Sequence, residues 1–317
     1  MSNPFDTLRL PVFAAPMFLV SGPEMVIAAC KAGVGGAFPT PNCRTVEDLD
    51  RWMGQITDAL QPGDAPWIAN MITHSTNARL AEDLRLVAEY KPPVVITALG
   101  SPKPVMETVK AYGGLVFADV ISMKLARKAA EAGVDGLACV SAGAGGHTGH
   151  LSPFAFISAV REFFDGYIAV GGGVGDGAGV AGAVAAGADF VYMGTRFLAT
   201  HESMAQAEYK QMVIDSGPDD LIVSAAVTGT PASWLKPSLR AAGQDPDNMG
   251  GPIDRNYSAG GDNKRWRDIW AAGQGLESVK AIEPVADVVA QLEREYAAAV
   301  DRFQTRTAGR PALRGAA

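Results

Sequence analysis

Cysteines, clusters of basic residues and long hydrophobic runs are scarce or absent in this sequence. Cys30, Cys43 and Cys139 are the only cysteines among 317 residues, and none is spaced as in a disulfide or metal motif. No apolar stretch reaches the roughly 18–20 residues that span a membrane, and the first residues do not follow a signal-peptide pattern. Lys and Arg form no block in a chain of net charge −7, which argues against nucleic acid as a partner. We therefore expect a cytoplasmic protein without a metal site or membrane segment.

Glycine is abundant instead, with 36 residues, and it gathers where strand-like apolar runs end. Three such runs, 136–140, 167–170 and 190–193, lead into Gly145-Gly146-His147-Thr148-Gly149, Gly171-Gly172-Gly173 and Gly194-Thr195. Glycines at strand ends let the backbone approach a ligand, and successive amides there can bind an anion. His147 adds a titratable side chain. The pattern predicts a phosphate site with a histidine beside it.

The spacing of a repeated helix-to-strand turn indicates a barrel. Ala32-Gly33-Val34, Ala132-Gly133-Val134 and Ala186-Gly187-Ala188 each suit a glycine at a helix C-cap before a strand. The intervals between them divide into units of about 25 residues, near the length of a βα unit. We therefore expect an α/β fold, the (β/α)8 TIM barrel. Strands are expected near 11–16, 34–38, 66–71, 93–98, 114–119, 135–141, 167–171 and 189–194, and helical spacing covers 23–32, 45–60, 77–90, 121–132 and 175–186.

A doubly wound sheet is the alternative fold, but it rarely reaches eight units and would carry its glycine signature after the first strand. The segment 177–182 fits G-x-G-x-x-G, yet it lies inside an expected helix, so we reject it as a dinucleotide fingerprint. In a TIM barrel the loops after the seventh and eighth strands bind phosphate. A phosphorylated cofactor is therefore expected at Gly171–Gly173 and Gly194-Thr195.

The chain divides into three expected parts. Residues 1–203 form the cofactor-binding barrel, and 204–265 form a smaller lid-like subdomain, because Trp234, Leu235 and Leu239 give this polar region apolar side chains to bury. Residues 266–317 form a closing segment, a C-terminal helix and a frayed tail.

At this point the motifs resemble those of a known family. The segment 145–200, with Ala15-Pro16-Met17, Asn70 and 272–275, is similar to the nitronate monooxygenases. The most specific motifs are the Gly-Gly-His-Thr-Gly segment and Tyr192-Met193-Gly194-Thr195-Arg196-Phe197-Leu198-Ala199-Thr200. The resemblance spans most of the chain in order, and only loosely in 204–265.

The resemblance implies FMN as cofactor and the oxidation of alkyl nitronates, and of neutral nitroalkanes, by O2 to a carbonyl product and nitrite. His147 takes the place of the family's catalytic base, and no metal takes part. Removal of a proton next to a nitro group needs a base with a pKa near the working pH, which imidazole supplies. The cofactor-binding residues implied are Ala15, Pro16, Met17, Asn70, Asp119, Gly145, Gly146, Gly171, Gly172, Gly173, Gly194, Thr195, Gly273 and Gln274.

Two features depart from the family pattern. Asp119 ends the fifth strand, where some members carry a basic residue, and a carboxylate pointing inward would disfavour an anionic substrate or reduced flavin. The polar residues that often precede Gly-Gly-His are replaced by 141–144, Ser-Ala-Gly-Ala. The substrate is therefore expected to differ from that of well-studied members.

Two other functions stay open at this point. The first is an NAD(P)H-dependent FMN reductase of quinones or enoyl thioesters on the same scaffold. The second is a flavin-binding barrel with altered catalysis, which Asp119 and the altered residues 141–144 before the histidine segment would indicate. A homo-oligomer is compatible with the sequence, but the sequence does not indicate the number of subunits.

Overall fold

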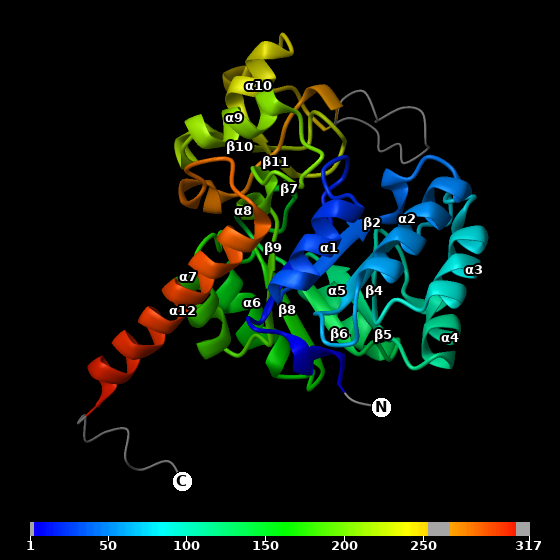
Figure 1. The fold of residues 1–317 in the computed structure, drawn as a ribbon. Coiled ribbons are helices and arrows are strands. Elements are labelled where there is room, and N and C mark those ends of the chain that lie inside the picture. The colour runs from blue at the N-terminus through cyan, green and yellow to red at the C-terminus, as the bar shows by residue number, and fades with distance from the viewer. Residues whose placement is uncertain (1–2, 253–266, 309–317) are drawn as a thin grey trace.

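Eight parallel strands close into a barrel, which confirms the predicted TIM-barrel fold (Figure 1). The computed structural model describes residues 3–252 and 267–308. The strands pair in chain order and the last pairs back with the first, so the barrel sheet has no open edge. They are β1 (Val12–Ala14), β2 (Gly35–Pro39), β3 (Trp67–Ile72), β4 (Val94–Ala98), β5 (Leu115–Val120), β6 (Gly136–Val140), β8 (Tyr167–Gly171) and β9 (Phe190–Met193).

Helices cover the outside of the barrel between successive strands (Figure 1). The five helical segments predicted from residue spacing match α1, α2, α3, α5 and α7 to within three residues at each end. Thr45, Ser122 and Asp176 cap three of them by accepting a hydrogen bond from a first-turn amide. The helices are α1 (Pro23–Ala32), α2 (Val46–Ala59), α3 (Leu80–Tyr90), α4 (Lys103–Ala111), α5 (Met123–Glu131), α6 (Pro153–Arg161), α7 (Gly177–Ala185) and α8 (Thr195–Leu198).

Aromatic side chains fill the barrel interior at its N-terminal end. Phe13 and Phe190 stack with ring centroids 4.5 Å apart, and Phe117 packs against both. The short 3-10 helix η1 (Pro4–Thr7) places Phe5 among these rings, 4.5 Å from Phe190. These rings occupy this end of the barrel interior, so we look for a ligand site at the opposite end, where the carboxyl ends of the strands lie.

Residues 207–248, part of the segment predicted to form a lid-like subdomain, lie over that opposite end (Figure 1). They contain α9 (Ala207–Asp215), η3 (Pro218–Asp220), β10 (Leu221–Ser224), β11 (Ala232–Leu235), α10 (Lys236–Ala241) and η4 (Pro246–Asn248). Trp234 and Leu239 are buried in one apolar cluster, and Leu235 is buried in another that includes Leu198 and Ala272. Of the segment expected to form this subdomain, residues 253–265 lie outside the described residues, as does most of the expected tail, 309–317.

The histidine segment belongs to this subdomain's sheet and not only to a loop after the sixth barrel strand. Gly146–His147 form the short strand β7, which pairs antiparallel with β11, and His147 lies opposite Ala232. β10 pairs with the other edge of β11. The sequence pattern did not indicate this strand, because two residues carry no detectable periodicity.

The C-terminal helix α12 (Val285–Thr307) packs along α7 and α1 on the outside of the barrel (Figure 1). A methyl group at Gly177 would lie 2.1 Å from the Leu292 carbonyl oxygen, so close helix packing explains this glycine of the 177–182 segment. This agrees with its rejection as a dinucleotide fingerprint. Among the described residues, no helix is long and apolar enough to cross a membrane.

Candidate active site

The loop after β9 contains Gly194, and the packing of the protein does not require a glycine there. A methyl group at Gly194 would make only ordinary contacts, 3.5 Å to Met17 Sδ and 3.8 Å to Ala15 Cβ. The Ala15 N–H donates to the Met193 carbonyl at 2.9 Å and joins the β1 and β9 ends. Three predicted site residues, Ala15, Met17 and Gly194, therefore lie together at the barrel mouth, with Pro16 between the first two in the chain.

At Gly171 and Gly172, unlike at Gly194, close packing against backbone carbonyl groups requires glycine. A methyl group at Gly172 would lie 2.6 Å from the Ala142 carbonyl oxygen, and the φ angle of Gly172 is +134°. A methyl at Gly171 would lie 2.8 Å from the Tyr192 carbonyl oxygen. The protein itself needs both glycines. Their predicted contact with a phosphate group stays a prediction.

The segment that starts at Gly273 bridges the loops after β6 and β9. Its Gly273 N–H donates to Thr195 Oγ1 at 2.9 Å, and the Gln274 N–H donates to the Gly143 carbonyl at 2.9 Å. A methyl group at Gly145 would lie 2.7 Å from the Gly273 nitrogen. The structure thus brings the predicted residues Gly145, Thr195, Gly273 and Gln274 together. Because the Thr195 oxygen only accepts here, its hydroxyl hydrogen can still be donated to a ligand.

A cavity of about 180 Å³ opens beside this bridge. Its lining residues are Gly173, Gly175, Asp176, Gln274, Gly275, Glu277 and Ser278. The carboxylates of Asp176 and Glu277 repel an anion, and the Asp176 carboxylate already caps α7 by accepting from the Gly179 N–H at 2.7 Å. The Gly194–Thr195 loop lies outside this lining, whereas Gly173 is part of it.

Polar side chains form a layer inside the barrel above the aromatic rings. Asn70, Asp119 and Tyr192 each come two residues after an interior core residue of their strands, and side chains two apart in a strand face the same side. The Asn70 amide donates to the Ile96 carbonyl at 3.3 Å. Asn70 and Asp119 were predicted from the sequence. Tyr192 was missed as a site residue, although its alternation with Phe190 indicates the same face.

Asp119 is the acid–base group of this layer. Burial raises the pKa of its carboxyl from 3.8 to about 7, and a hydrogen bond from the Asn70 side chain offsets part of that rise. Among the described residues, no group donates to its buried Oδ1 atom. Burial and the Asp119 charge both raise the pKa of Tyr192 well above 10, so this phenol stays neutral. The inward carboxylate anticipated as a departure from the family is thus present at the mouth.

His147 is held in place by its pairing in β7 and by two contacts of the next residue, Thr148. It is half-buried in β7, and next to it the Thr148 N–H donates to the Pro231 carbonyl at 3.1 Å. The Thr148 hydroxyl donates to the Ser141 carbonyl at 3.0 Å, which ties the segment back to the end of β6. His150 is exposed. The subdomain and the barrel therefore fix the position of His147 together.

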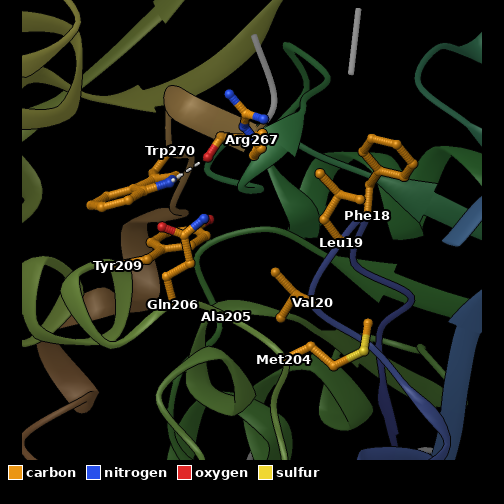
Figure 2. A pocket seen from close by; sticks show the side chains of 9 residues that line it. All are labelled: Phe18, Leu19, Val20, Met204, Ala205, Gln206, Tyr209, Arg267 and Trp270. Atoms are coloured by element: carbon orange, nitrogen blue, oxygen red, sulfur yellow. Dashed lines mark hydrogen bonds between the residues drawn. The ribbon is translucent and has the colours of Figure 1, made fainter. Parts of the chain in front are cut away.

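A second cavity, of about 60 Å³, lies between the loop after β1 and α9 (Figure 2). Its lining residues are Phe18, Leu19, Val20, Met204, Ala205, Gln206, Tyr209, Arg267 and Trp270. The Tyr209 and Trp270 rings stack with centroids 5.0 Å apart. The cavity is far smaller than the roughly 300–1,000 Å³ of cofactor pockets. It lies where the loop after β1, residues 18–20, meets residues 204–209.

The residues at the mouth fit a flavin mononucleotide at both of its ends. Gly194 offers backbone that a Cβ would partly cover, and Thr195 offers a donor, which suits the phosphate. The Asn70 side-chain amide, which has both a donor and an acceptor, suits a ring that carries both donors and acceptors. Among the described residues, no group of three or more acidic, His or Cys side chains is arranged to hold a metal ion.

The sequence is similar to those of known proteins. The family profile described as nitronate monooxygenase matches residues 3–295. A nitronate monooxygenase of Neurospora crassa is 26% identical over 95% of this chain and 93% of its own. A (3aS,4S,5R,7aS)-5-hydroxy-7a-methyl-1-oxo-octahydro-1H-indene-4-carboxyl-CoA dehydrogenase of Rhodococcus jostii is 30% identical over 77% of this chain and 67% of its own.

Among solved structures, a nitroalkane oxidase from Streptomyces ansochromogenes has the same fold. The TM-score is 0.80 at 23% identity, and the superposition covers 95% of this chain and 100% of that one. Since the family profile matches nearly the whole sequence and the barrel agrees with it, this protein belongs to the nitronate monooxygenase family and is an oxidoreductase.

Proposed function

We propose that this protein binds FMN and uses O2 to oxidise alkyl nitronates, and neutral nitroalkanes, to a carbonyl product and nitrite. The observation that carries the proposal is the convergence of Met17, Gly194 and Thr195 at one mouth of a barrel with a polar interior layer. Family membership supports the same reaction class.

Each part of the site has a proposed task. Gly171, Gly172, Gly173, Gly194 and Thr195 hold the phosphate, and the backbone around Gly194 can approach it without a side chain in between. Ala15, Pro16, Met17, Asn70, Gly145 and Gly146 surround the ring, and Gly273 and Gln274 close the site. In the same proposal, residues 1–203 form the FMN-binding barrel, 204–265 the lid, and 266–317 the closing segment, helix and tail. FMN, when bound, supplies the redox chemistry, and the protein supplies position and a dry environment.

His147 acts as the base for neutral substrates. It removes the proton on the carbon next to the nitro group, and the strand pairing of β7 with β11 fixes the backbone that carries it. A nitronate has already lost this proton and does not need the base. Both substrate and O2 are small molecules, so the barrel mouth can admit them past the lid.

We expect the purified protein to be yellow and to release FMN, not FAD, on denaturation. The Gly194–Thr195 loop provides one phosphate cradle, and the other cavity beside the bridge is lined by the carboxylates of Asp176 and Glu277, which disfavour a second phosphate. Chromatography of the released flavin against both standards checks this. FAD as the main species, or a colourless protein that takes up no FMN, contradicts the cofactor assignment.

Gly194→Ala should weaken FMN binding without unfolding the protein. The added methyl fits the protein, since its nearest contact is Met17 Sδ at 3.5 Å, but it covers backbone that the phosphate must reach. If the phosphate loses one hydrogen bond from this backbone, at a cost of about 1–1.5 kcal/mol, the Kd for FMN rises roughly tenfold. Fluorescence titration of the apoprotein with FMN measures this change.

Gly182→Ala is the matched control for that variant. A methyl at Gly182 would also find room, with its nearest neighbour at 4.0 Å, but Gly182 lies within α7 on the outside of the barrel. Its Kd for FMN should equal that of the unmodified protein. Equal affinities for Gly194→Ala and Gly182→Ala would move the phosphate site away from the β9 loop. Gly172→Val is a poorer test, because its clash with Ala142 disturbs the loop in any case.

A second candidate function is NAD(P)H-dependent reduction of a thioester or quinone on the same flavin. The observation in its favour is the 30% identity to the Rhodococcus jostii dehydrogenase, which is named for a CoA-thioester substrate. Anaerobic mixing with NADH separates the two functions. Rapid bleaching of the flavin by NADH, without bleaching by a nitro compound, would favour the reductase.

A further inference from the structure

Asp119 lies inside the barrel near its mouth, and among the described residues no cation neutralises its charge. It ends β5 on the interior side of the barrel, above Phe117, and its Oδ1 atom is buried without a hydrogen-bond donor among the described residues. Its side chain lies in one layer with Asn70 and Tyr192, at the end of the barrel where ligands enter.

The groups around Asp119 leave it without a cation. Asn70 on β3 offers a neutral amide, and Tyr192 on β9 offers a phenol that stays protonated. On the neighbouring strand β6, burial raises the pKa of the Cys139 thiol to about 12, so this thiol is neutral as well. Among the described residues, no Lys or Arg contributes to the ionisation of Asp119. An ionised Asp119 therefore places one uncompensated negative charge at the barrel mouth.

We propose that the protonation state of Asp119 decides the charge of the substrate that the site accepts. With Asp119 protonated, its O–H can donate to an anion such as a nitronate or carboxylate, and the site binds it. With Asp119 ionised, two negative charges would meet in a poorly solvated space, so the site accepts neutral molecules only. For the nitro substrates this inference rests on the proposed function: the neutral nitroalkane is the substrate above the pH at which Asp119 ionises, and the nitronate below it.

Under this proposal, binding of an anion is coupled to the uptake of one proton by Asp119. When an anion binds to the ionised form, one proton moves from solvent to a carboxylate oxygen of Asp119, and no other bond forms or breaks. The Kd for the anion then rises tenfold for each pH unit above the pKa of about 7, while the Kd for a neutral ligand does not change. His147 lies in β7 and serves the neutral substrate, so the two groups serve substrates of different charge.

Butyrate tests the proposal because it stays an anion across the range and does not react with the flavin. FMN-loaded protein is titrated with butyrate at several pH values between about 6 and 9, and binding is read from the flavin absorbance. We expect the tenfold rise per pH unit in the unmodified protein. Asp119→Asn, which keeps the shape of the side chain and cannot ionise, should bind butyrate with a Kd that does not vary with pH.

Glu131→Gln is the charge-matched control. It removes one negative charge at the exposed end of α5, and helix ends of this kind lie at the opposite end of the barrel. It should follow the unmodified protein. Calorimetry of butyrate binding near pH 8, in two buffers of different ionisation enthalpy, gives an independent result on the unmodified protein: we expect uptake of about one proton.

The outcomes separate this inference from the proposed function. A Kd that is independent of pH in the unmodified protein, no proton uptake, no butyrate binding near pH 6, or an unchanged pH dependence in Asp119→Asn overturns the role of Asp119. None of these results depends on turnover. If neither nitroethane nor ethylnitronate is oxidised, the proposed function falls, while the butyrate titration still reports on Asp119.

Discussion

Replacing His147 with Asn should lower the turnover of neutral nitroethane by roughly 10²–10⁴, the usual contribution of a general base. Asn keeps a comparable size and some hydrogen bonding, but it cannot accept the substrate proton at neutral pH. The variant should retain FMN, because β7 is held by backbone pairing with Ala232 and by the neighbouring Thr148. Oxidation of ethylnitronate should fall far less, since its proton has already gone. Steady-state rates with both substrates near pH 7, where both protonation states of Asp119 are populated, measure the effect.

His150→Asn is the matched control for this experiment. His150 is exposed and lies three residues after His147, so its replacement should leave both rates unchanged. A folding defect would lower the two rates of His147→Asn alike, whereas loss of the base lowers one. Equal losses on both substrates, or no loss on either, would refute the base role of His147.

Replacing Asp119 with Asn should change how stability depends on pH. In the native protein the pKa of Asp119 is raised from 3.8 to about 7, so the folded state holds this proton more tightly than the unfolded chain does. Its contribution to stability is therefore fully present below about pH 4 and is lost as the pH rises to about 7. The shift corresponds to about 4 kcal/mol, of which roughly 3 kcal/mol lies between pH 5 and pH 8.

Urea unfolding of the apoprotein checks that expectation. The free energy of unfolding of Asp119→Asn, relative to the unmodified protein, should increase by roughly 3 kcal/mol from about pH 5 to about pH 8. Taking the difference between the two proteins cancels the titration of all other groups. A difference that stays constant over this range would mean that Asp119 titrates alike in the folded and unfolded chains.

The barrel could be predicted from the sequence because its signals are local. The glycines at 33, 133 and 187 have positive φ angles in the turns between a helix and the next strand, so their spacing reports the βα unit. The apolar runs are short and uninterrupted, as in parallel strands covered on both sides. Those features depend only on neighbouring residues.

The pairing of the histidine segment could not be predicted in this way. β7 is defined by its contact with Ala232 and Ser233, which lie far along the chain, and two residues have no pattern of their own. The structural reason for each glycine was equally hidden. Gly172 and Gly194 look alike in sequence, but only Gly172 is required by a neighbouring carbonyl.

Asp119 could be predicted from the sequence only in part. Its position at the end of the fifth strand was evident, and its alternation with Phe117 indicates an interior side chain. Its lack of a cationic partner depends on β3, β6 and β9, which meet it only in the closed barrel. The departure from the family pattern thus becomes a functional hypothesis only once the neighbouring strands are in place.

The most direct test of the proposed function is anaerobic mixing of the FMN-loaded protein with ethylnitronate, nitroethane or NADH, followed by flavin absorbance. We expect the flavin to bleach with the nitro compounds and to recover its yellow colour when O2 is admitted, with nitrite in the solution. We expect no rapid bleaching with NADH. Bleaching by NADH, together with a flavin that stays oxidised in the presence of both nitro compounds, would contradict the proposed function.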